Sequence, residues 1–460
     1  MAGKQEVDDL PARILVEISR GFVRYDDGRV GCERTRNRDA LLLSARKLRR
    51  IVMQPFAQTD GGELVARAFV RIRHAGQFQW HGNVLQRVHC GDQVERLEYD
   101  ADMPGYPAGA TDSEQALSLV ERLPGFRVLA WHNGALYASR GYEAMCGTMN
   151  GGRMHWQSVG RYRPAAWRSL TSKNKITSRL VRDGFHALAV TPGGHLIGAV
   201  PGAIVTLISG QSEFAVTHRI TRGTRPLHVT PTPHGRVLFG EYFSNEQRDQ
   251  VHIHASQDEG QTWGPAYTFP KGAVRHVHNI VYDRWENCLW IFTGDHGEEC
   301  RILRASCDLK TIETVMAGNQ QARAVAAVVT AEGIYFASDT PLEANHIYRL
   351  SRDGSLTTLA DLDSSCIEGC IVGETAVFST MVEPSPANPS RLVSLYAGRE
   401  PGSWRCIASW TKDAWPMRFF QYGNAFLPTG ENPTEYLAVT TIAVHADDLV
   451  TSIFKLPYGK

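Results

Sequence analysis

Residues 276–295 read HVHNIVYDRWENCLWIFTGD, which is two short apolar runs separated by a polar turn and followed by a carboxylate. Runs of this length, bounded by Asp, Asn and Gly, are typical of β-strands joined by tight turns. The same order returns along the chain, and each copy opens near a charged or histidine residue: His186, His228, His276, Arg323, Glu368 and Arg418. These residues are 42, 48, 47, 45 and 50 positions apart, which indicates a repeated unit.

A second marker repeats with a similar period. The second apolar run of four successive units is followed by a carboxylate, and these carboxylates belong to Glu241, Asp295, Asp339 and Glu383. They are separated by 54, 44 and 44 residues. Four strands in about 40 to 50 residues are expected for one blade of a β-propeller. With an opening unit at 126–163 and a closing unit at 415–456, the repeat predicts a mainly β, seven-bladed propeller over 125–460, with six or eight blades as alternatives.

The preceding residues, 1–124, form a small mixed, strand-rich N-terminal region without the repeat. Helix signals stand out at 39–50 and at 112–123, where an Asp or Ser precedes an apolar run. No GxGxxG or GxxxxGK[ST] motif of a nucleotide site occurs there. Three roles remain open for this region: shaping the mouth of the propeller, adding a partner surface, or donating a strand that closes the ring.

Composition and charge exclude several classes of protein. The chain has 49 Lys and Arg against 48 Asp and Glu, so a nucleic-acid binder that relies on bulk positive charge is disfavoured. With 43% hydrophobic residues, disorder is excluded as the main state. No apolar signal segment follows the N-terminus, and Gly and Pro interrupt the weakly polar stretch at 196–209, which is too short for a membrane span. We therefore expect a soluble, cytoplasmic protein and leave its oligomeric state open.

One turn carries a family resemblance. Residues 256–263 read SQDEGQTW, of the form S-x-D-x-G-x-T-W, and resemble the Asp-box, or BNR repeat, of the sialidase-like β-propellers. Incomplete copies lie at 306–308 and 351–354. In such a turn Asp258 accepts backbone N–H bonds, Gly260 permits the tight bend and Trp263 packs between sheets. The resemblance implies the propeller fold and by itself implies no activity.

Blade connectivity indicates where a site would lie. The first strand of a blade lines the channel and the chain reverses at each turn, so the starts of first strands and the loops after second strands share one rim. On this rim we assign as catalytic candidates Glu241, Tyr242, His276, His278 and Asp295. Candidate substrate-binding residues are His186, Arg225, His228, Arg275, Arg323, Asp339, Glu383 and Arg418.

These residue types suit an acidic sugar. Arginine forks bind carboxylates, as in the sialidase-like enzymes, although the same arginines can instead pair with carboxylates across blades. Glu241, Tyr242 and Asp295 offer the acid, nucleophile and activated tyrosine of glycoside hydrolysis. A lyase would instead need a base for the C5 proton of a uronate, for which His228, His276 and Tyr242 are candidates.

The HxH pair at 276 and 278 points to one face of its strand. With His228 it can hold a divalent metal, although we expect that no cofactor is required. A second HxH pair, His252 and His254, lies on a third strand and is expected to be structural. The leading hypothesis is a glycoside hydrolase that cleaves an acidic glycan or oligosaccharide at the mouth of the channel. The alternatives are a lyase and a non-catalytic propeller that binds a ligand or a protein.

Overall fold

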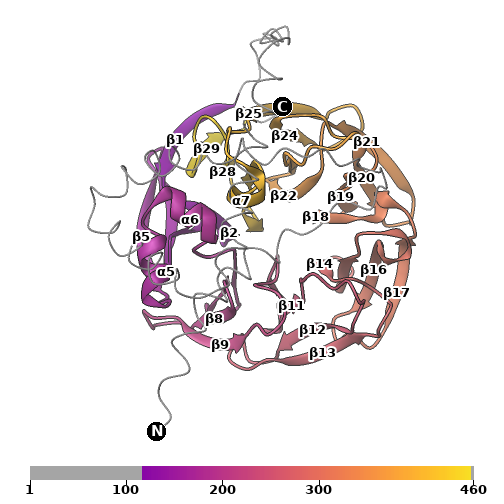
Figure 1. Cartoon of the computed structure of the whole chain (residues 1–460), viewed down its shortest axis with the longest axis horizontal. Coiled ribbons are helices and arrows are strands. Elements are labelled where there is room, and N and C mark those ends of the chain that lie inside the picture. Colours follow the sequence, from indigo (N-terminus) through magenta and orange to yellow (C-terminus); the bar gives the residue numbers. More distant parts are fainter. Residues whose placement is uncertain (1–116, 457–460) are drawn as a thin grey trace, which may run out of the picture. The chain divides into compact units, whose positions relative to one another are not determined.

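The computed structural model describes residues 117–456, which form a ring of seven antiparallel blades around a central channel (Figure 1). The expected fold, a mainly β propeller with seven blades, is confirmed. Of the N-terminal region 1–124, only the last eight residues belong to the described part, so the predicted helix at 39–50 lies outside it and the role of residues 1–116 stays a prediction.

Six blades contain four strands, and blade 1 has a fifth strand, β27 (Thr429–Gly430), on its inner edge. First strands of neighbouring blades contact one another, and β27 contacts the first strand of blade 6. Blades 1 to 4 consist, from the channel outward, of β2 (Arg127–His132), β3 (Ala135–Arg140), β4 (Glu143–Asn150) and β5 (Arg153–Arg161); β6 (Ala187–Val190), β7 (Leu196–Val200), β8 (Ala203–Leu207) and β9 (Ala215–Arg219); β10 (Thr230–Pro231), β11 (Val237–Gly240), β12 (Val251–Ser256) and β13 (Gly264–Phe269); and β14 (Val277–Asp283), β15 (Cys288–Thr293), β16 (Arg301–Ser306) and β17 (Ile312–Ala317).

Blades 5 to 7 follow the same order: β18 (Ala324–Thr330), β19 (Gly333–Ser338), β20 (Asn345–Ser351) and β21 (Leu356–Leu362); β22 (Cys366–Val372), β23 (Thr375–Thr380), β24 (Leu392–Gly398) and β25 (Arg405–Thr411); and β26 (Asn424–Phe426), β28 (Tyr436–Ile442), β29 (Val450–Lys455) and β1 (Ser118–Pro124). The short elements between them are α5 (Ala166–Thr171), α6 (Lys175–Val181), η2 (Gly297–Glu299), η3 (Gln320–Ala322), α7 (Met417–Phe420) and β27 (Thr429–Gly430).

The second strands explain why the sequence shows continuous apolar runs. Every residue of β15 and β19 is buried, because neighbouring blades cover both faces of these strands. The packing between blades is close: a Cβ at Gly240, the last residue of β11, would lie 2.3 Å from the Cβ of Val277 in the next blade. The core is therefore a series of apolar layers between blades, and it fixes the residues that follow each second strand.

The ring closes by pairing the two ends of the propeller. Strand β1 pairs antiparallel with β29 and supplies the outer strand of blade 7, while β27 pairs in parallel with β2 of blade 1. The described end of the N-terminal region thus donates the closing strand, and this strand precedes the predicted boundary at residue 125. The expected helix at 112–123 is wrong over 118–123, because pairing with β29 overrides the local helical pattern.

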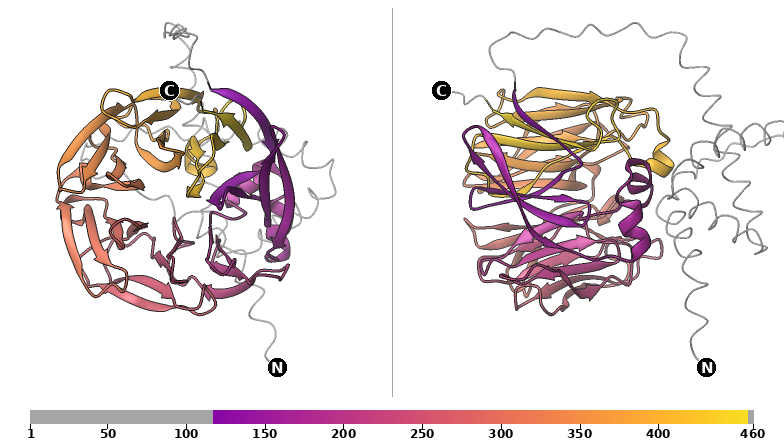
Figure 2. Two further views of the ribbon diagram at one scale, coloured as in Figure 1. Left: turned by 180° about the vertical axis from the view of Figure 1, so that it is seen from behind. Right: turned by 90° about the vertical axis from the view of Figure 1, so that its left-hand side faces the viewer.

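Three short helices lie on one face of the ring, where the chain passes from one blade to the next (Figure 2, right). Helix α6 begins after Asn174, whose side chain accepts bonds from the N–H groups of the first turn. Its buried Arg179 donates to Asp413 at 2.6 Å and to Asp448 at 3.1 Å, which joins α6 to the segments that flank blade 7. Arg418 lies exposed on α7, so the prediction that it opens the first strand of blade 7 is wrong; that strand is β26.

The turn at 256–263 has the hydrogen bonds expected for its sequence. Asp258 accepts from the N–H groups of Gln261 and Thr262, and Gly260 adopts a φ of 86°. The indole of Trp263 packs against the apolar layer between blades 2 and 3 and donates to Thr217. This turn therefore acts as a structural connection between two blades.

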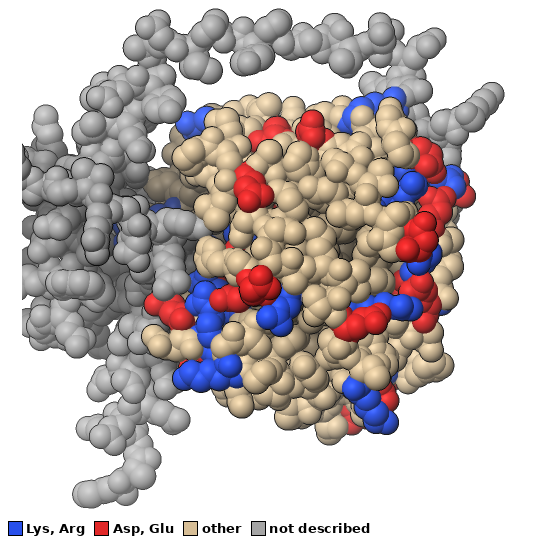
Figure 3. Space-filling model, turned by 90° about the vertical axis from the view of Figure 1, so that its right-hand side faces the viewer, with Lys and Arg blue, Asp and Glu red and all other residues tan. Residues whose placement is uncertain are grey.

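The side of the ring carries mixed charges. Figure 3 shows basic and acidic side chains next to one another on this surface. Ion pairs of blades 4 to 6 are of this kind, such as Arg304 with Glu286 and Arg349 with Glu400. In residues 117–456 no helix is long and apolar enough to cross a membrane. The cytoplasmic location stays a prediction.

Candidate functional site

The two sets of rim residues meet as the connectivity predicts. Backbone bonds join the start of a first strand to the end of a second strand: Val277 N–H donates to the carbonyl of Glu241, and Asp339 N–H donates to the carbonyl of Arg323. The charged side chains of these segments divide into two groups. We call Asp295, Asp339, Glu383, Arg275 and Arg323 the acidic side, and Arg127, Arg182, Arg225, His186 and His228 the arginine side.

Asp295, two residues after β15, is the centre of the acidic side. Its Oδ2 atom lies 2.7 Å from Nη1 of Arg275, and its Oδ1 atom lies 3.5 Å from Nε of Arg323. Burial alone would raise its pKa, but His276, His278 and Arg323 lower the pKa well below its usual range. The Asp295 carboxylate is therefore ionised at neutral pH.

Arg323 connects Asp295 to a second pair of carboxyl groups. Its Nη2 atom lies 3.4 Å from Oδ2 of Asp339, and the Oδ1 atom of Asp339 is buried without a hydrogen-bond partner among residues 117–456. Burial raises the pKa of Asp339 and that of Glu383, and Arg323 opposes both shifts. The charge of Asp295 adds to both shifts, and that of Glu383 adds to the shift of Asp339. Burial alone would lower the pKa of Arg323, but the charges of Asp339, Asp295 and Glu383 raise it above its usual value. Arg323 therefore contacts Asp295 and Asp339 and also interacts electrostatically with Glu383.

His276 and His278 face Asp295 from the inner strand. Their Nε2 atoms are 3.0 Å apart, and each lies 3.4 Å from Oδ1 of Asp295. Burial lowers the pKa of His278 to about 4, so this ring is neutral at pH 7. The ring of Tyr242 packs on His276, with ring centroids 4.3 Å apart. The predicted HxH pair and Asp295 are thus brought together.

The arginine side has a different organisation. Arg127 opens β2, Arg182 follows α6 in a left-handed conformation, and Arg225 precedes β10. Burial, together with nearby Arg182 and Arg127, lowers the pKa of Arg225 to about 9. Burial also lowers the pKa of Arg127 to about 10. No carboxylate of residues 117–456 lies within ion-pair distance of Arg127 or Arg225. Both guanidinium groups remain charged at neutral pH.

A small cavity adjoins these arginines. It has a volume of about 40 Å³, and its polar lining residues include Arg127, His186, His228 and Glu368. This space suits a few water molecules or one carboxylate group. Burial lowers the pKa of His228 to about 4 and raises that of Glu368 to about 7. His228 faces this cavity. The third member of the cluster formed by His276 and His278 is Asp295.

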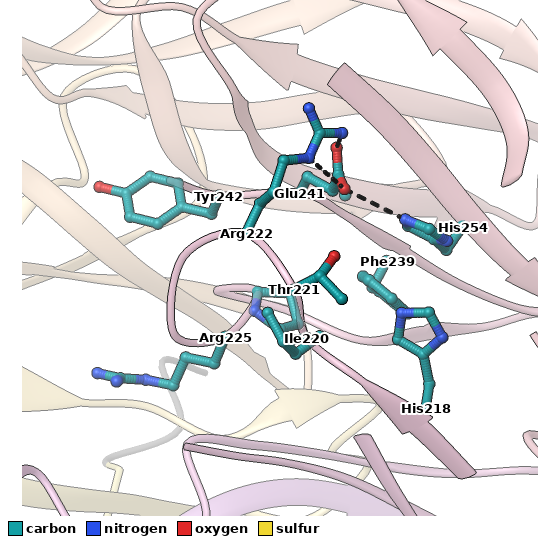
Figure 4. A pocket seen from close by; sticks show the side chains of 11 residues that line it. His218, Ile220, Thr221, Arg222, Arg225, Phe239, Glu241, Tyr242 and His254 are labelled. Carbon is teal, nitrogen blue, oxygen red and sulfur yellow. Dashed lines mark hydrogen bonds and ion pairs between the residues drawn. The ribbon is translucent and has the colours of Figure 1, made fainter. Parts of the chain in front are cut away.

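Glu241 and Tyr242 are neighbours in sequence but point in opposite directions (Figure 4). The Glu241 carboxylate pairs with Arg222 and lies 3.4 Å from Nε2 of His254, while Tyr242 and Arg225 point away from it. These residues surround a cavity of about 10 Å³, which has room for one water molecule. The structure does not bring Glu241 and Tyr242 together as a tyrosine and its activating carboxylate. Burial also raises the pKa of Tyr242, which disfavours it as a base.

Two arginines of the site were missed in the sequence. Arg127 is the first residue of β2, the first strand of blade 1. Arg323 directly precedes the first strand of blade 5, so a comparison of the two blades in the repeat could have found Arg127. Arg182 lies in the helical connection between blades 1 and 2, where no repeat signal exists. A group that can hold a metal ion consists of His276, His278 and Asp295, and the predicted set with His228 in place of Asp295 is corrected.

The fold and channel define a seven-bladed β-propeller with a polar channel. No protein-family model and no curated protein matches the sequence. Among solved structures the chain is similar to the WD40 β-propeller domain of Doa1, with 12% identity, a TM-score of 0.46, and coverage of 74% of this chain and 97% of that one. It is also similar to a chain of the Mitotic Checkpoint Complex, with 10% identity, a TM-score of 0.47, and coverage of 78% of this chain and 98% of that one. The β-propeller domain of Cps50 (Swd1) from Myceliophteria thermophila matches with 10% identity, a TM-score of 0.46, and coverage of 72% of this chain and 96% of that one.

These likenesses are too distant to carry function. None of the comparisons supports the sialidase-like assignment, which rests on residues 256–263 alone. Catalytic and substrate-binding roles of the channel residues therefore stay predictions.

Proposed function

We propose that the propeller is a binding module whose channel takes a small acidic sugar. Its carboxylate lies on the arginine side and its hydroxyl groups face the acidic side. The observation that carries this proposal is the pair Arg127 and Arg225, two channel arginines without a carboxylate in contact among residues 117–456. Both side chains are partly buried, where a charge gains from a close counter-ion, and guanidinium groups bind carboxylates in a two-pronged geometry. A bound carboxylate would offset the repulsion that Arg225 experiences.

Size and hydrogen bonding favour this orientation. The cavity of about 40 Å³ beside Arg127 accommodates the carboxylate group but no sugar ring, so in this proposal the ring lies outside the cavity. Across the channel, Oδ1 of Asp339 is a buried acceptor without a hydrogen-bond partner among the described residues. A sugar hydroxyl would supply the missing donor. This mode of binding requires no cofactor.

Binding without cleavage agrees best with the positions of the carboxyl groups. Glu241 is engaged by Arg222, and Asp295 is held ionised beside Arg275, so neither is placed as the proton donor of a glycosidase. One observation favours hydrolysis as a second candidate. Burial raises the pKa of Asp339, and a carboxyl group that keeps its proton near neutral pH can act as a general acid.

Calorimetric titration of the full chain tests the binding proposal. We expect glucuronate, galacturonate or sialate to bind saturably and glucose to bind at least tenfold more weakly. Replacing Arg225 by Gln should weaken binding of the acidic sugar by about 10- to 100-fold, because a charge-assisted hydrogen bond is lost. Arg405→Gln, at an exposed position of outer strand β25, is the matched control and should bind as the wild type does.

Absence of saturable binding by all three acidic sugars, or equal affinity of the wild type and Arg225→Gln, would contradict the proposal. Chromatography of uronate- and sialate-containing oligosaccharides after incubation separates the two candidates. Intact oligosaccharides agree with a binding module. Products that disappear with Asp339→Asn would instead establish the hydrolase.

A further inference from the structure

We propose that His276, His278 and Asp295 bind one divalent transition-metal ion, of which Zn²⁺ is the representative. The site lies on the acidic side and is separate from the arginines that carry the proposed sugar binding. It does not depend on the identity of the sugar. The inference rests on the positions of three donor atoms and on the groups that hold them.

The backbone fixes the tautomer of both rings. Nδ1 of His276 lies 3.1 Å from the carbonyl oxygen of Phe243, and Nδ1 of His278 lies 3.1 Å from that of Ala324. A carbonyl oxygen only accepts hydrogen bonds, so each Nδ1 carries the proton. In a neutral ring the Nε2 atom then presents its lone pair. The two Nε2 atoms, which are the ring nitrogens left free to bind an ion, therefore face each other across 3.0 Å beside the carboxylate of Asp295.

The three donor atoms match the size of a metal site. Nε2 of His276, Nε2 of His278 and Oδ1 of Asp295 form a triangle with sides of 3.0, 3.4 and 3.4 Å. A circle through these atoms has a radius of about 1.9 Å, so an ion slightly above their plane lies about 2.1 Å from all three, the usual length of Zn–N and Zn–O bonds. Without an ion or an extra proton, the same three atoms repel one another.

The outer contacts are those of metal ligands. Metal-binding histidines usually donate their other ring N–H to a carbonyl or carboxylate, and both histidines do so here. Asp295 is oriented by Arg275, which contacts Oδ2 and leaves Oδ1 directed at the histidines. Tyr242 packs on the ring of His276 and limits its rotation. The donor set is thus held in place before an ion binds.

Charge and donor type select the ion. Arg275 and Arg323 near Asp295 oppose a cation, but the ionised Asp295 and the neighbouring carboxyl groups of Asp339 and Glu383 offset part of this positive charge. Two imidazoles and one carboxylate favour Zn²⁺, Fe²⁺ and similar ions over Ca²⁺ and Mg²⁺, which prefer oxygen ligands. We therefore expect selectivity for Zn²⁺ over Mg²⁺.

Other groups of similar composition in residues 117–456 are already engaged. Asp283, which neighbours Glu286 and Cys288, accepts hydrogen bonds from Trp290 and pairs with Arg352. The second HxH pair also has separate partners: Nδ1 of His252 lies 2.8 Å from Oγ1 of Thr268, and Nε2 of His254 faces Glu241, which Arg222 neutralises. His252 and His254 therefore form a matched control with the same sequence spacing.

The experiment uses the full chain, produced without a polyhistidine tag, stripped with a chelator and dialysed against Zn²⁺. We expect one equivalent of zinc by elemental analysis, and visible d–d absorption when Co²⁺ replaces Zn²⁺. Asp295→Asn and His278→Gln should each weaken Zn²⁺ binding by about 100-fold or more, because each removes or neutralises a direct ligand. The double variant His252→Gln/His254→Gln should bind within about twofold of the wild type.

Circular dichroism of each variant shows whether it is folded, and the Co²⁺ spectrum of the wild type tests the site without any substitution. Less than one tenth of an equivalent of zinc, together with no d–d bands, would overturn the proposal; the histidines would then share a proton. Equal loss of zinc from the His252/His254 control would overturn the location. Retention of one equivalent of zinc by both Asp295→Asn and His278→Gln would also overturn the location.

Discussion

The acidic side and the arginine side of the channel contain similar charged groups but differ in how these groups are paired. Arg275 and Arg323 contact carboxylates of the protein itself, and Arg323 bridges Asp295 of one blade and Asp339 of the next. Arg127 and Arg225 have no such contact among residues 117–456. A buried charge is stable when it is paired, so the acidic side is a structural network and the arginine side is suited to an external anion.

This difference shows that residue type alone does not separate structural from binding arginines. Arg225, Arg275 and Arg323 all precede the first strand of a blade, and the sequence allowed either pairing across blades or ligand binding for each. The partner that each guanidinium meets decides between the two roles. The comparison predicts opposite stability effects when an arginine is removed from one side or the other.

The largest effect is expected for Arg323→Gln. Removing this charge leaves Asp295, Asp339 and Glu383 without their common partner, and breaking such a buried network costs roughly 3–5 kcal/mol of unfolding free energy. Urea unfolding of the full chain measures this change. Adding Asp339→Asn should recover part of the loss, because it removes one of the uncompensated charges.

The control for this experiment is Arg304→Gln. Arg304 pairs with Glu286 and Glu313 on the partly exposed outer part of blade 4, where an ion pair contributes about 0–1 kcal/mol. If Arg323→Gln lost no more stability than Arg304→Gln, the acidic side would not be a structural network.

A smaller effect of the opposite sign is expected for Arg225→Gln without ligand. Burial and the neighbouring Arg182 and Arg127 disfavour the charge at this position, so its removal should raise the unfolding free energy by about 1 kcal/mol or leave it unchanged. The gain should shrink at high salt, since salt screens repulsion. Destabilisation of several kcal/mol in the same urea experiment would mean that Arg225 has a structural partner, and the contrast between the two sides would disappear.

Much of the fold could be predicted because it depends on local and repeated signals. The buried second strands, such as β15 and β19, are covered on both faces and so read as continuous apolar runs. The carboxylates after them mark the period. Ring closure could not be predicted in this way, because β1 becomes a strand through pairing with β29, about 330 residues further along the chain. Local pattern at 112–123 favoured a helix instead.

The site was predictable to the level of the rim but not to the level of side-chain partners. Connectivity placed His276, His278 and Asp295 on one rim, and they do form a cluster. It also placed Glu241 there, yet the side chain of Glu241 turns toward Arg222 and His254. Backbone connectivity does not determine the direction of a side chain, because the residue after a strand no longer follows the alternation of the sheet.

A pH-dependent effect is expected for Glu368, the carboxyl group that lines the cavity of the arginine side. Burial raises its pKa from an ordinary value near 4.5 to about 7, while Arg127 partly opposes this shift. Between these two pH values the unfolded chain has lost the proton and the folded protein still holds it. Stability therefore falls as pH rises through this window, by about 1–2 kcal/mol after allowance for partial exposure.

Replacing Glu368 by Gln removes this titration. As pH rises from 4.5 to 7, the unfolding free energy of the wild type should therefore decrease relative to that of the variant. His186 and His228 line the same cavity, and their lowered pKa values make stability rise with pH in the same range, because these side chains titrate near 6.5 in the unfolded chain. This contribution is common to the wild type and Glu368→Gln, so the difference between the two proteins isolates Glu368. Glu374→Gln, at an exposed position, should follow the wild type. If the unfolding free energies of the wild type and Glu368→Gln changed in parallel with pH, the raised pKa of Glu368 would be contradicted. Since protonation of Glu368 removes the negative charge nearest Arg127, acidic sugars should also bind more tightly below pH 7, and this gain should be absent in Glu368→Gln.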